Sequence, residues 1–191
     1  MFKDLVKANR SYRGFDSSVA ITRDELLDLV DHARLTPSSI NSQPFKYFLA
    51  YEKEIVAKIQ PATKWAGALS HLNLPREGKC PTAFIVICLD LNLGRTVANC
   101  QKDVGIVAQT ILLAATEKGL GGCMIGSYNT DEISESLNLD ESIVPVLVIG
   151  LGKPDETIII EEIPNGDSIK YYRDENDVHF VPKRKLEDII L

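Results

Sequence analysis

The first clear pattern along the chain is an amphipathic helix that leads into a polar segment. Apolar residues recur at helical spacing from Leu26 to Ala33, and Thr22 followed by Glu25 has the sequence of a capping box. The next residues, 36–45, read TPSSINSQPF, with small hydrogen-bonding side chains between two prolines. The pattern therefore predicts a helix that delivers the chain to a turn-rich loop.

The remaining elements are predicted from apolar runs and from helical spacing. Five shorter elements are expected: strands at 45–51, 83–89 and 144–152, and helices at 52–59 and 130–137, the last with Thr130 as its N-cap. From 95 to 118 there is no proline, and residues 104–115 are apolar around nearly the whole helical circumference. This predicts a long helix that is buried on most sides, with Gly119 at its end.

Strands and helices intermingle without a strict strand-helix-strand alternation, which favours an α+β sandwich over a doubly wound parallel sheet. With 191 residues, of which 45% are hydrophobic, the chain suits a single domain, 1–191. The tail beyond about 155 is charged and loop-rich and has few core-forming residues. Such a tail is readily explained if it extends over a second subunit, so we expect a homodimer with the long helix at its centre.

Charge and composition argue against several classes of protein. The formal net charge of −6 disfavours binding to nucleic acid or to an anionic membrane, because both need a basic surface. No stretch approaches the ~20 apolar residues of a membrane span, and the N-terminal residues lack the apolar core of a secretory signal. The four cysteines and three histidines are too scattered for a zinc site or a disulfide framework. We therefore expect a cytoplasmic protein without a metal site.

Two basic clusters stand out in this acidic chain, RSYR at 10–13 and KRK at 183–185. Each cluster alone is typical of a solvated surface. Guanidinium groups and a serine hydroxyl together suit a phosphate, because they offer several donors to its oxygens. The two clusters and the polar loop would together satisfy the phosphate, the ribityl chain and the ring edge of flavin mononucleotide, FMN.

The loop between Pro37 and Pro44 and the glycines at 119–126 each allow a functional and a structural interpretation. The two prolines fix φ, which favours an ordered turn that holds a polar, planar ligand, while an ordinary surface loop stays open as the alternative. The glycine segment follows a helix and lacks G-x-G-x-x-G spacing, so it is a weak candidate for a dinucleotide fingerprint. Its first glycine suits a helix end, and the others suit a backbone that closely approaches a flat ring.

Four blocks of the chain, in this order, resemble the nitroreductase family: RSYRGF at 10–15, ARLTPSSINSQPF at 33–45, 103–115 together with GLGGCMIG at 119–126, and VPKR at 181–184. They extend over nearly the whole chain. The resemblance implies a homodimeric α+β flavoprotein, an α/β/α sandwich with a central, mainly antiparallel sheet and a C-terminal tail that embraces the partner subunit. It also implies that FMN binds at the subunit interface.

The resemblance implies a set of cofactor-binding residues. Arg10 and Ser11 correspond to phosphate contacts, and Arg13 to the basic residue near the ribityl chain and the N1 side of the ring. The loop that reaches the flavin from the neighbouring subunit corresponds here to Pro37, Ser38, Ser39, Asn41 and, more weakly, Gln43. The backbone along the reactive N5 region corresponds to Ile125 and Gly126, and the C-terminal phosphate ligands to Lys183 and Arg184, with the register open by one residue.

Many members of the family carry an arginine at the position of Asn9. This departure either weakens phosphate binding or leaves the asparagine to donate a neutral hydrogen bond.

The acceptor pocket is expected outside the motifs, with Trp65, His71 or Tyr128 as candidates. Trp65 is more typical of a packed core or interface, and His71 and His179 are more typical of the surface.

The resemblance implies an FMN-dependent oxidoreductase that uses NAD(P)H in a ping-pong hydride transfer to a nitroaromatic, a quinone or a similar small acceptor. The protein would position the reactants, so no side chain is expected to act as a catalytic acid or base. The alternative is a module that binds, stores or senses FMN without useful turnover. Reductive dehalogenation or flavin breakdown would need insertions for which the chain leaves little room.

Overall fold

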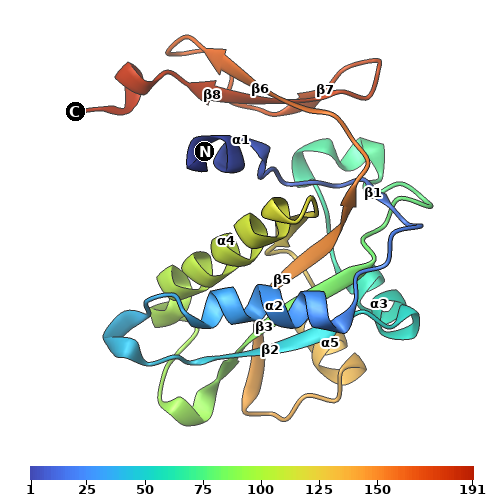
Figure 1. The fold of residues 1–191 in the computed structure, drawn as a ribbon, viewed down its shortest axis with the longest axis vertical. Helices are drawn as coiled ribbons and strands as arrows, with labels where there is room; N and C mark the ends of the chain where they lie inside the picture. Colours follow the sequence, from blue (N-terminus) through green and yellow to red (C-terminus); the bar gives the residue numbers. More distant parts are fainter.

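The computed structural model describes residues 1–191 and places helices on both faces of a central sheet (Figure 1). The helices and strands, in chain order, are α1 (Phe2–Ala8), β1 (Phe15–Asp16), α2 (Arg23–Arg34), β2 (Phe45–Ala50), α3 (Lys53–Ile59), β3 (Ala83–Asp90), α4 (Gln101–Glu117), β4 (Gly121–Ile125), α5 (Thr130–Ser136), β5 (Ile143–Pro154), β6 (Ile158–Ile163), β7 (Tyr172–Arg173) and β8 (His179–Arg184). Each strand and helix predicted above is present, with boundaries that differ by a few residues.

The central sheet has five strands in the order β1-β5-β3-β2, and β4 also pairs with β5. All of these pairs are antiparallel. From Ala83 to Leu89 every residue of β3 is buried, because the strand lies in the middle of the sheet and is covered on both faces. The predicted α+β sandwich with an antiparallel central sheet is confirmed.

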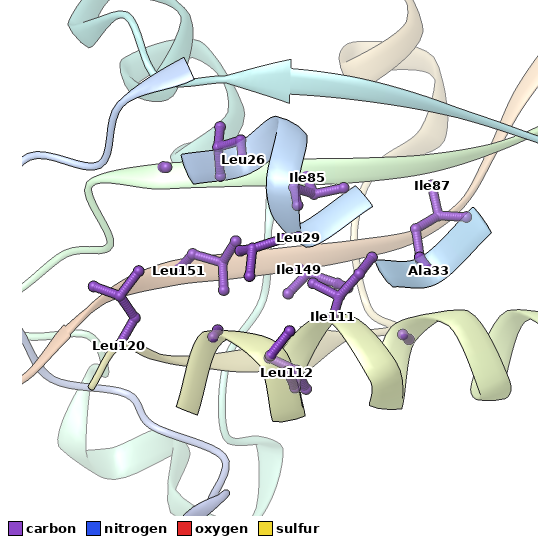
Figure 2. Packing of buried hydrophobic residues seen from close by; sticks show 14 of the residues in the cluster. Leu26, Leu29, Ala33, Ile85, Ile87, Ile111, Leu112, Leu120, Ile149 and Leu151 are labelled. Atoms are coloured by element: carbon purple, nitrogen blue, oxygen red, sulfur yellow. The ribbon is translucent and has the colours of Figure 1, made fainter. Parts of the chain in front are cut away.

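Alternate residues of β3 belong to two different halves of the core. Ile85 and Ile87 pack with apolar residues of α2 and α4, and Figure 2 shows these side chains between the two helices and the sheet. Phe84 and Val86 pack on the other face with residues of α3 and α5. The period of two along a strand thus distributes one continuous apolar run between two layers of helices.

Helix α4 begins at Gln101, after a short turn at Ala98–Cys100, and is therefore shorter than the proline-free stretch. Its inner face is buried, but Ile106 on its outer face is exposed. Gly119 follows the helix with φ of +71°, a conformation that glycine adopts without strain. The helix is thus partly open to solvent in the single chain.

The cap predictions have different outcomes. The capping box of α2 is confirmed, since the Glu25 amide donates to the Thr22 hydroxyl and the Glu25 carboxylate accepts from the Thr22 amide. The prediction that Thr130 caps α5 is wrong by one residue. Asn129 is the N-cap, and its side-chain oxygen accepts from the amide of Glu132.

The tail is loop-rich, as expected, but it also forms a second, three-stranded sheet in the order β6-β8-β7, which the sequence pattern does not predict. Strands β6 and β8 are parallel, and the ring of Tyr172 stacks on that of Phe180 with centroids 5.0 Å apart. Figure 1 shows this sheet, in orange and red, on the side of the molecule where α1 lies. Its extension over a partner subunit stays a prediction.

No helix in the structure is apolar over a length sufficient to cross a membrane.

Candidate cofactor site

The segment that follows α1 lies between β4 and the tail sheet. Ser11 forms a parallel bridge with Gly122, and the amide of Tyr12 donates to the Gly122 carbonyl over 3.1 Å. On the tail side, the amide of Arg13 donates to the carboxylate of Glu156. These main-chain contacts hold the RSYR segment in an extended conformation beside the sheet.

Residues from both ends of the chain line one cavity of about 190 Å³, which we call the arginine cavity. Arg10, Ser11, Arg13 and Lys183 supply its donors, and the rest of its wall comes from Ile158, Tyr171, His179 and Val181. Three cationic side chains therefore converge without a carboxylate in the wall. The Nε atoms of Arg10 and Arg13 are buried and have no hydrogen-bond partner. This donor set fits an anion with several oxygens, such as a phosphate.

Arg13 is held against the tail by its side chain as well as its backbone. Its Nη1 lies 3.2 Å from the Ser11 carbonyl oxygen and 3.3 Å from Nε2 of His179. Its guanidinium carbon lies 5.0 Å from the centroid of the Tyr171 ring, in cation–π geometry. The guanidinium group is thus fixed before any ligand is bound.

His179 is only 1% exposed, so the expectation of a surface histidine is wrong. It is the first residue of β8, where the strand alternation turns it inward beneath the Tyr171 ring, 5.4 Å away between centroids. Burial lowers the pKa of His179 to about 4, and the nearby cations Arg13 and Arg173 contribute. The ring is therefore neutral at pH 7, and its Nε2 accepts from Arg13.

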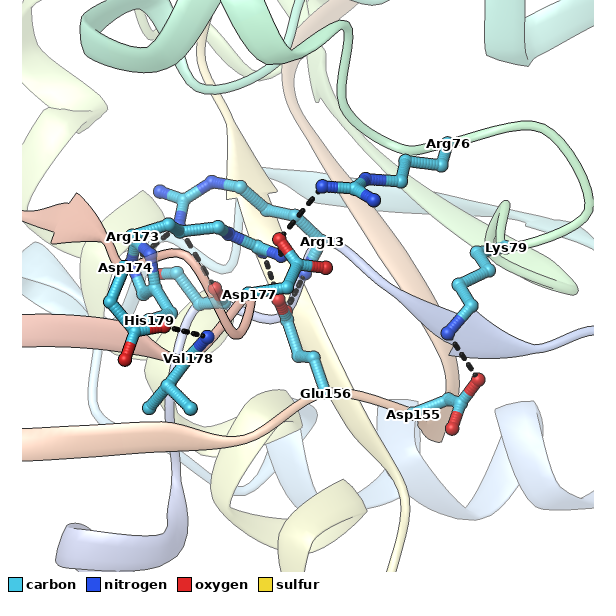
Figure 3. A network of polar contacts seen from close by, with 11 residues as sticks. Arg13, Arg76, Lys79, Asp155, Glu156, Arg173, Asp174, Asp177, Val178 and His179 are labelled. Atoms are coloured by element: carbon cyan, nitrogen blue, oxygen red, sulfur yellow. Dashed lines mark hydrogen bonds and ion pairs between the residues drawn. The ribbon is translucent and has the colours of Figure 1, made fainter.

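Behind this histidine lies an ion-pair network, shown in Figure 3. Glu156 pairs with Arg173, and their side chains are only 4% and 5% exposed. Asp177 contacts both Arg173, at 3.1 Å, and Arg76, at 2.8 Å. Sequence reasoning missed Glu156 and Arg173, because they look like ordinary charges of a polar tail and only the fold buries them.

The loop from Pro37 to Pro44, called the proline loop below, is ordered, as predicted. Its centre is a short turn at Ser39–Asn41, and Ile40, Asn41 and Gln43 have φ values of 51°, 54° and 43°. The amide of Gln43 donates to the Ser38 hydroxyl over 3.1 Å. The amide of Ser39 donates to both carboxylate oxygens of Asp103, at 3.1 and 3.2 Å. A β-branched residue at positive φ is strained, and such strain clusters at functional sites.

The proline loop does not meet the arginine cavity within one chain. Through Asp103 the loop contacts the N-terminal end of α4, whereas Ser11 and Tyr12 contact Gly122, beyond the C-terminal end of the helix. A helix of 17 residues is about 25 Å long. Ser38 and Gln43 line a separate cavity of about 160 Å³, and Pro37, Ser39 and Asn41 are exposed.

The remaining predicted residues lie at the ends of β4 and β8. Ile125 is buried in the sheet, and Gly126 is exposed just beyond it. The next residue, Ser127, accepts from the amide of Lys64 over 2.8 Å and lines a cavity of about 410 Å³. Lys183 lines the arginine cavity, whereas the adjacent Arg184 is exposed and does not.

Trp65 also lines the cavity beside Ser127, yet most of its contacts are structural. Its indole donates to the Thr63 hydroxyl over 2.8 Å, and its ring meets that of Phe15 edge to face at 6.4 Å. A Cβ on Gly150 would lie 2.7 Å from it. The packing interpretation of Trp65 is thus supported, with one part of the ring open to the cavity.

The interpretation of the glycines as a close approach to a flat ring is wrong for two of them. A Cβ on Gly121 would lie 2.5 Å from the Tyr12 ring, and one on Gly122 would lie 2.6 Å from the Gly150 carbonyl. These glycines let the RSYR segment and β5 pack closely against β4. Gly126 differs, because a Cβ there would meet nothing within 4 Å.

The model of the nitroreductase family matches residues 6–70 and 78–153 of the chain. The chain belongs to the nitroreductase family. A relative from Methanothermobacter thermautotrophicus, provisionally named NADH dehydrogenase/NAD(P)H nitroreductase, is 30% identical over 159 residues, which cover 80% of this chain and 77% of the relative. The part of the chain that matches the family model ends before the tail sheet.

Solved structures of nitroreductase family proteins share the fold. One from Clostridium novyi NT has a TM-score of 0.66 and 26% identity, and the alignment covers 81% of this chain and 86% of the other. A structure from Exiguobacterium sibiricum 255-15, solved in complex with FMN, also has a TM-score of 0.66, with 22% identity and coverage of 81% and 88%. The likeness to the second structure is evidence for the fold.

Proposed function

We propose that this nitroreductase family member is an FMN-dependent oxidoreductase that uses NAD(P)H to reduce a nitroaromatic, a quinone or a similar small acceptor. The observation that carries the proposal is the arginine cavity, in which Arg10, Ser11, Arg13 and Lys183 converge from the two ends of the chain. A phosphate is the part of FMN that this donor set fits. The names of the relatives and the FMN complex of a structural neighbour support the same cofactor and electron donor.

Asn9 would take part in the same site as a neutral donor. It is largely buried, and its side-chain nitrogen has no hydrogen-bond partner. A buried amide without a partner is costly, so a ligand acceptor would stabilise it. This favours the interpretation in which Asn9 donates a hydrogen bond where other family members have an arginine.

A second copy of the chain would complete the site. The proline loop and the arginine cavity lie toward opposite ends of α4, so the loop would serve the FMN of the partner. Ile40 in the loop is 86% exposed, Phe2 of α1 is 71% exposed, and Ile106 of α4 is also exposed. Apolar side chains exposed on these elements favour burial in a homodimer.

Bound FMN would supply two-electron transfer between NAD(P)H and the acceptor, and the chain would position the reactants. Arg10, Arg13 and Lys183 would neutralise the phosphate. The backbone at Ile125 and Gly126 would border the reactive edge of the ring, where the structure leaves open space. The neighbouring cavity of about 410 Å³, lined in part by Lys64, Trp65 and Ser70, would accept the small substrate without a side-chain acid or base.

The visible spectrum of the purified protein tests the cofactor, and anaerobic titration tests the activity. We expect flavin absorption bands that bleach with NADH or NADPH and recover when a quinone or a nitroaromatic is added. A protein that binds FMN but does not bleach would contradict the enzymatic proposal and favour a binding or storage module. A protein that binds no flavin would contradict both.

A further inference from the structure

Three residues of the tail hold Arg13 in place, and two of them, Tyr171 and His179, also line the arginine cavity. Glu156 accepts from the Arg13 amide, Nε2 of His179 faces its Nη1 at 3.3 Å, and Tyr171 lies against the face of its guanidinium. Arg13 therefore has fixed positions for both its backbone and its side chain. The carbonyl of the neighbouring Ser11 is tied to the same guanidinium at 3.2 Å.

Glu156 and Arg173 form the buried base of this arrangement. Their side chains are 4% and 5% exposed. Oε1 of Glu156 accepts from the Arg13 amide, and Oε2 accepts from Arg173. A buried carboxylate is tolerated only when its oxygens are paired in this way. Removal of its charge would leave Arg173 with the partly exposed Asp177 as its one carboxylate partner and would loosen the backbone at Arg13.

His179 joins the network to the strand that carries Lys183. Its neutral ring accepts from Arg13, while four residues further along β8 the side chain of Lys183 lines the same cavity. The tail sheet therefore supplies one phosphate donor and also holds another in place. All of these tail residues lie beyond 153, the last residue that the family model matches.

We propose that Glu156, Arg173 and His179 are positioning residues for the phosphate end of the FMN site. They fix Arg13 and the Ser11 backbone in the arrangement that receives the phosphate, and they touch neither the flavin ring nor the acceptor. This inference rests on the proposed function and adds to it the tail network as the element that organises the phosphate donors.

The test compares the dissociation constants of FMN and of riboflavin, which lacks the phosphate. In Glu156→Gln we expect the dissociation constant of FMN to rise about 10-fold, because a charge-assisted hydrogen bond behind Arg13 is lost, while that of riboflavin changes less than about 2-fold. Asp155→Asn is the matched control. Asp155 is adjacent and also ion-paired, with Lys79 at 2.9 Å, but both partners are about half exposed, so the change should alter neither constant.

A second pair of variants addresses the histidine without removing a charge. His179→Leu removes the acceptor and should weaken FMN selectively, whereas His179→Gln keeps an acceptor and should restore binding to within about 3-fold of the original protein. The ³¹P resonance of bound FMN should shift in His179→Leu and return toward its original position in His179→Gln.

The outcomes separate this inference from the proposed function. An original protein that binds neither flavin, or binds FMN no better than riboflavin, contradicts the proposed phosphate site and the inference with it. A preference for FMN that survives both Glu156→Gln and His179→Leu contradicts the inference alone. Equal weakening of FMN and riboflavin in these variants would also overturn it, because that result indicates a role in the fold only.

Discussion

The arginine cavity and the proline loop are both polar, yet they are built in opposite ways. Around Arg13 a buried carboxylate and a buried neutral imidazole contact the half-buried arginine within one chain, although Nε of Arg13 and Nδ1 of His179 have no hydrogen-bond partner. The proline loop is anchored at Ser39 by Asp103, but its tip is exposed and carries Ile40 at positive φ. One region is organised by contacts within the single chain, and the other exposes groups that the single chain does not contact.

The difference indicates which part of the proposed site is organised within one chain, and which part would depend on the proposed homodimer. Buried charge networks hold their members rigidly, because each unpaired group would be costly. The proline loop is held by hydrogen bonds from its backbone amides to the side chains of Asp103 and Ser38, and Ile40 at its tip is exposed. We therefore expect the phosphate end to depend on contacts within the chain and the loop to act across the interface.

The largest expected effect is the loss of FMN affinity when one residue of the arginine cavity or of the proline loop is replaced. Arg10→Ala should weaken FMN about 100-fold, because charge-assisted hydrogen bonds to a phosphate are lost, and the exposed Arg23→Ala should change binding less than about 2-fold. Asn41→Ala should weaken FMN about 10-fold. A mixed dimer of one Arg10→Ala chain and one Asn41→Ala chain decides whose site the loop serves.

If the loop reaches the partner, the mixed dimer has one site with both defects and one intact site. FMN titration should then show half the stoichiometry at the affinity of the original protein. If each loop serves its own chain, both sites carry one defect and no site retains that affinity. A monomeric protein that binds FMN tightly would contradict the proposal that the proline loop acts across a subunit interface.

A smaller effect is expected from the buried histidine. The pKa of His179 is lowered from 6.5 to about 4, so between these values the unfolded chain binds more protons than the folded chain. The free energy of unfolding should therefore fall as the pH is lowered from 6.5 to 4, by roughly 1 to 3 kcal/mol. Arg13 and Arg173 oppose protonation of the ring, and Asp177 favours it.

Chemical denaturation at several pH values between about 4 and 6.5 measures how steeply the free energy of unfolding changes with pH. His179→Gln should remove the part of the slope that belongs to the imidazole, leaving the contribution of the carboxylates. An unchanged slope in this variant would show that the histidine protonates as easily in the folded protein as in the unfolded chain.

The smallest effect concerns the anchor of the proline loop. Asp103→Asn replaces a carboxylate that accepts twice from Ser39 with a neutral amide, which should lower the stability by about 1 kcal/mol and the melting temperature by about 2 to 4 °C. Hydrogen exchange of the Ser39 amide should become faster. Asp131→Asn, in the first turn of α5 and exposed, controls for the loss of a charge near a helix N-terminus. Equal effects in the two variants would argue against Asp103 as a specific anchor.

Much of the fold could be predicted from local patterns. The buried strand 83–89, the amphipathic helix that follows Thr22 and the glycine after the long helix each have a local cause, which is periodicity, capping or φ. The four motif blocks also indicated the family, and the family model confirms it. Predictions failed where a local signal had two physical explanations, as with Gly121 and Gly122, which are small because strands pack against them.

The sequence by itself determined the elements, the sandwich and the residue types that suit a phosphate, because these depend on spacing and chemistry along the chain. Only the tertiary structure decided that the polar tail forms a sheet, that His179 and Glu156 are buried behind Arg13, and that the proline loop lies at the far end of α4. The physical reason is that burial and charge pairing are set by contacts between residues distant along the chain, 166 positions for Arg13 and His179 and 64 for Ser39 and Asp103, for which the sequence carries no local pattern.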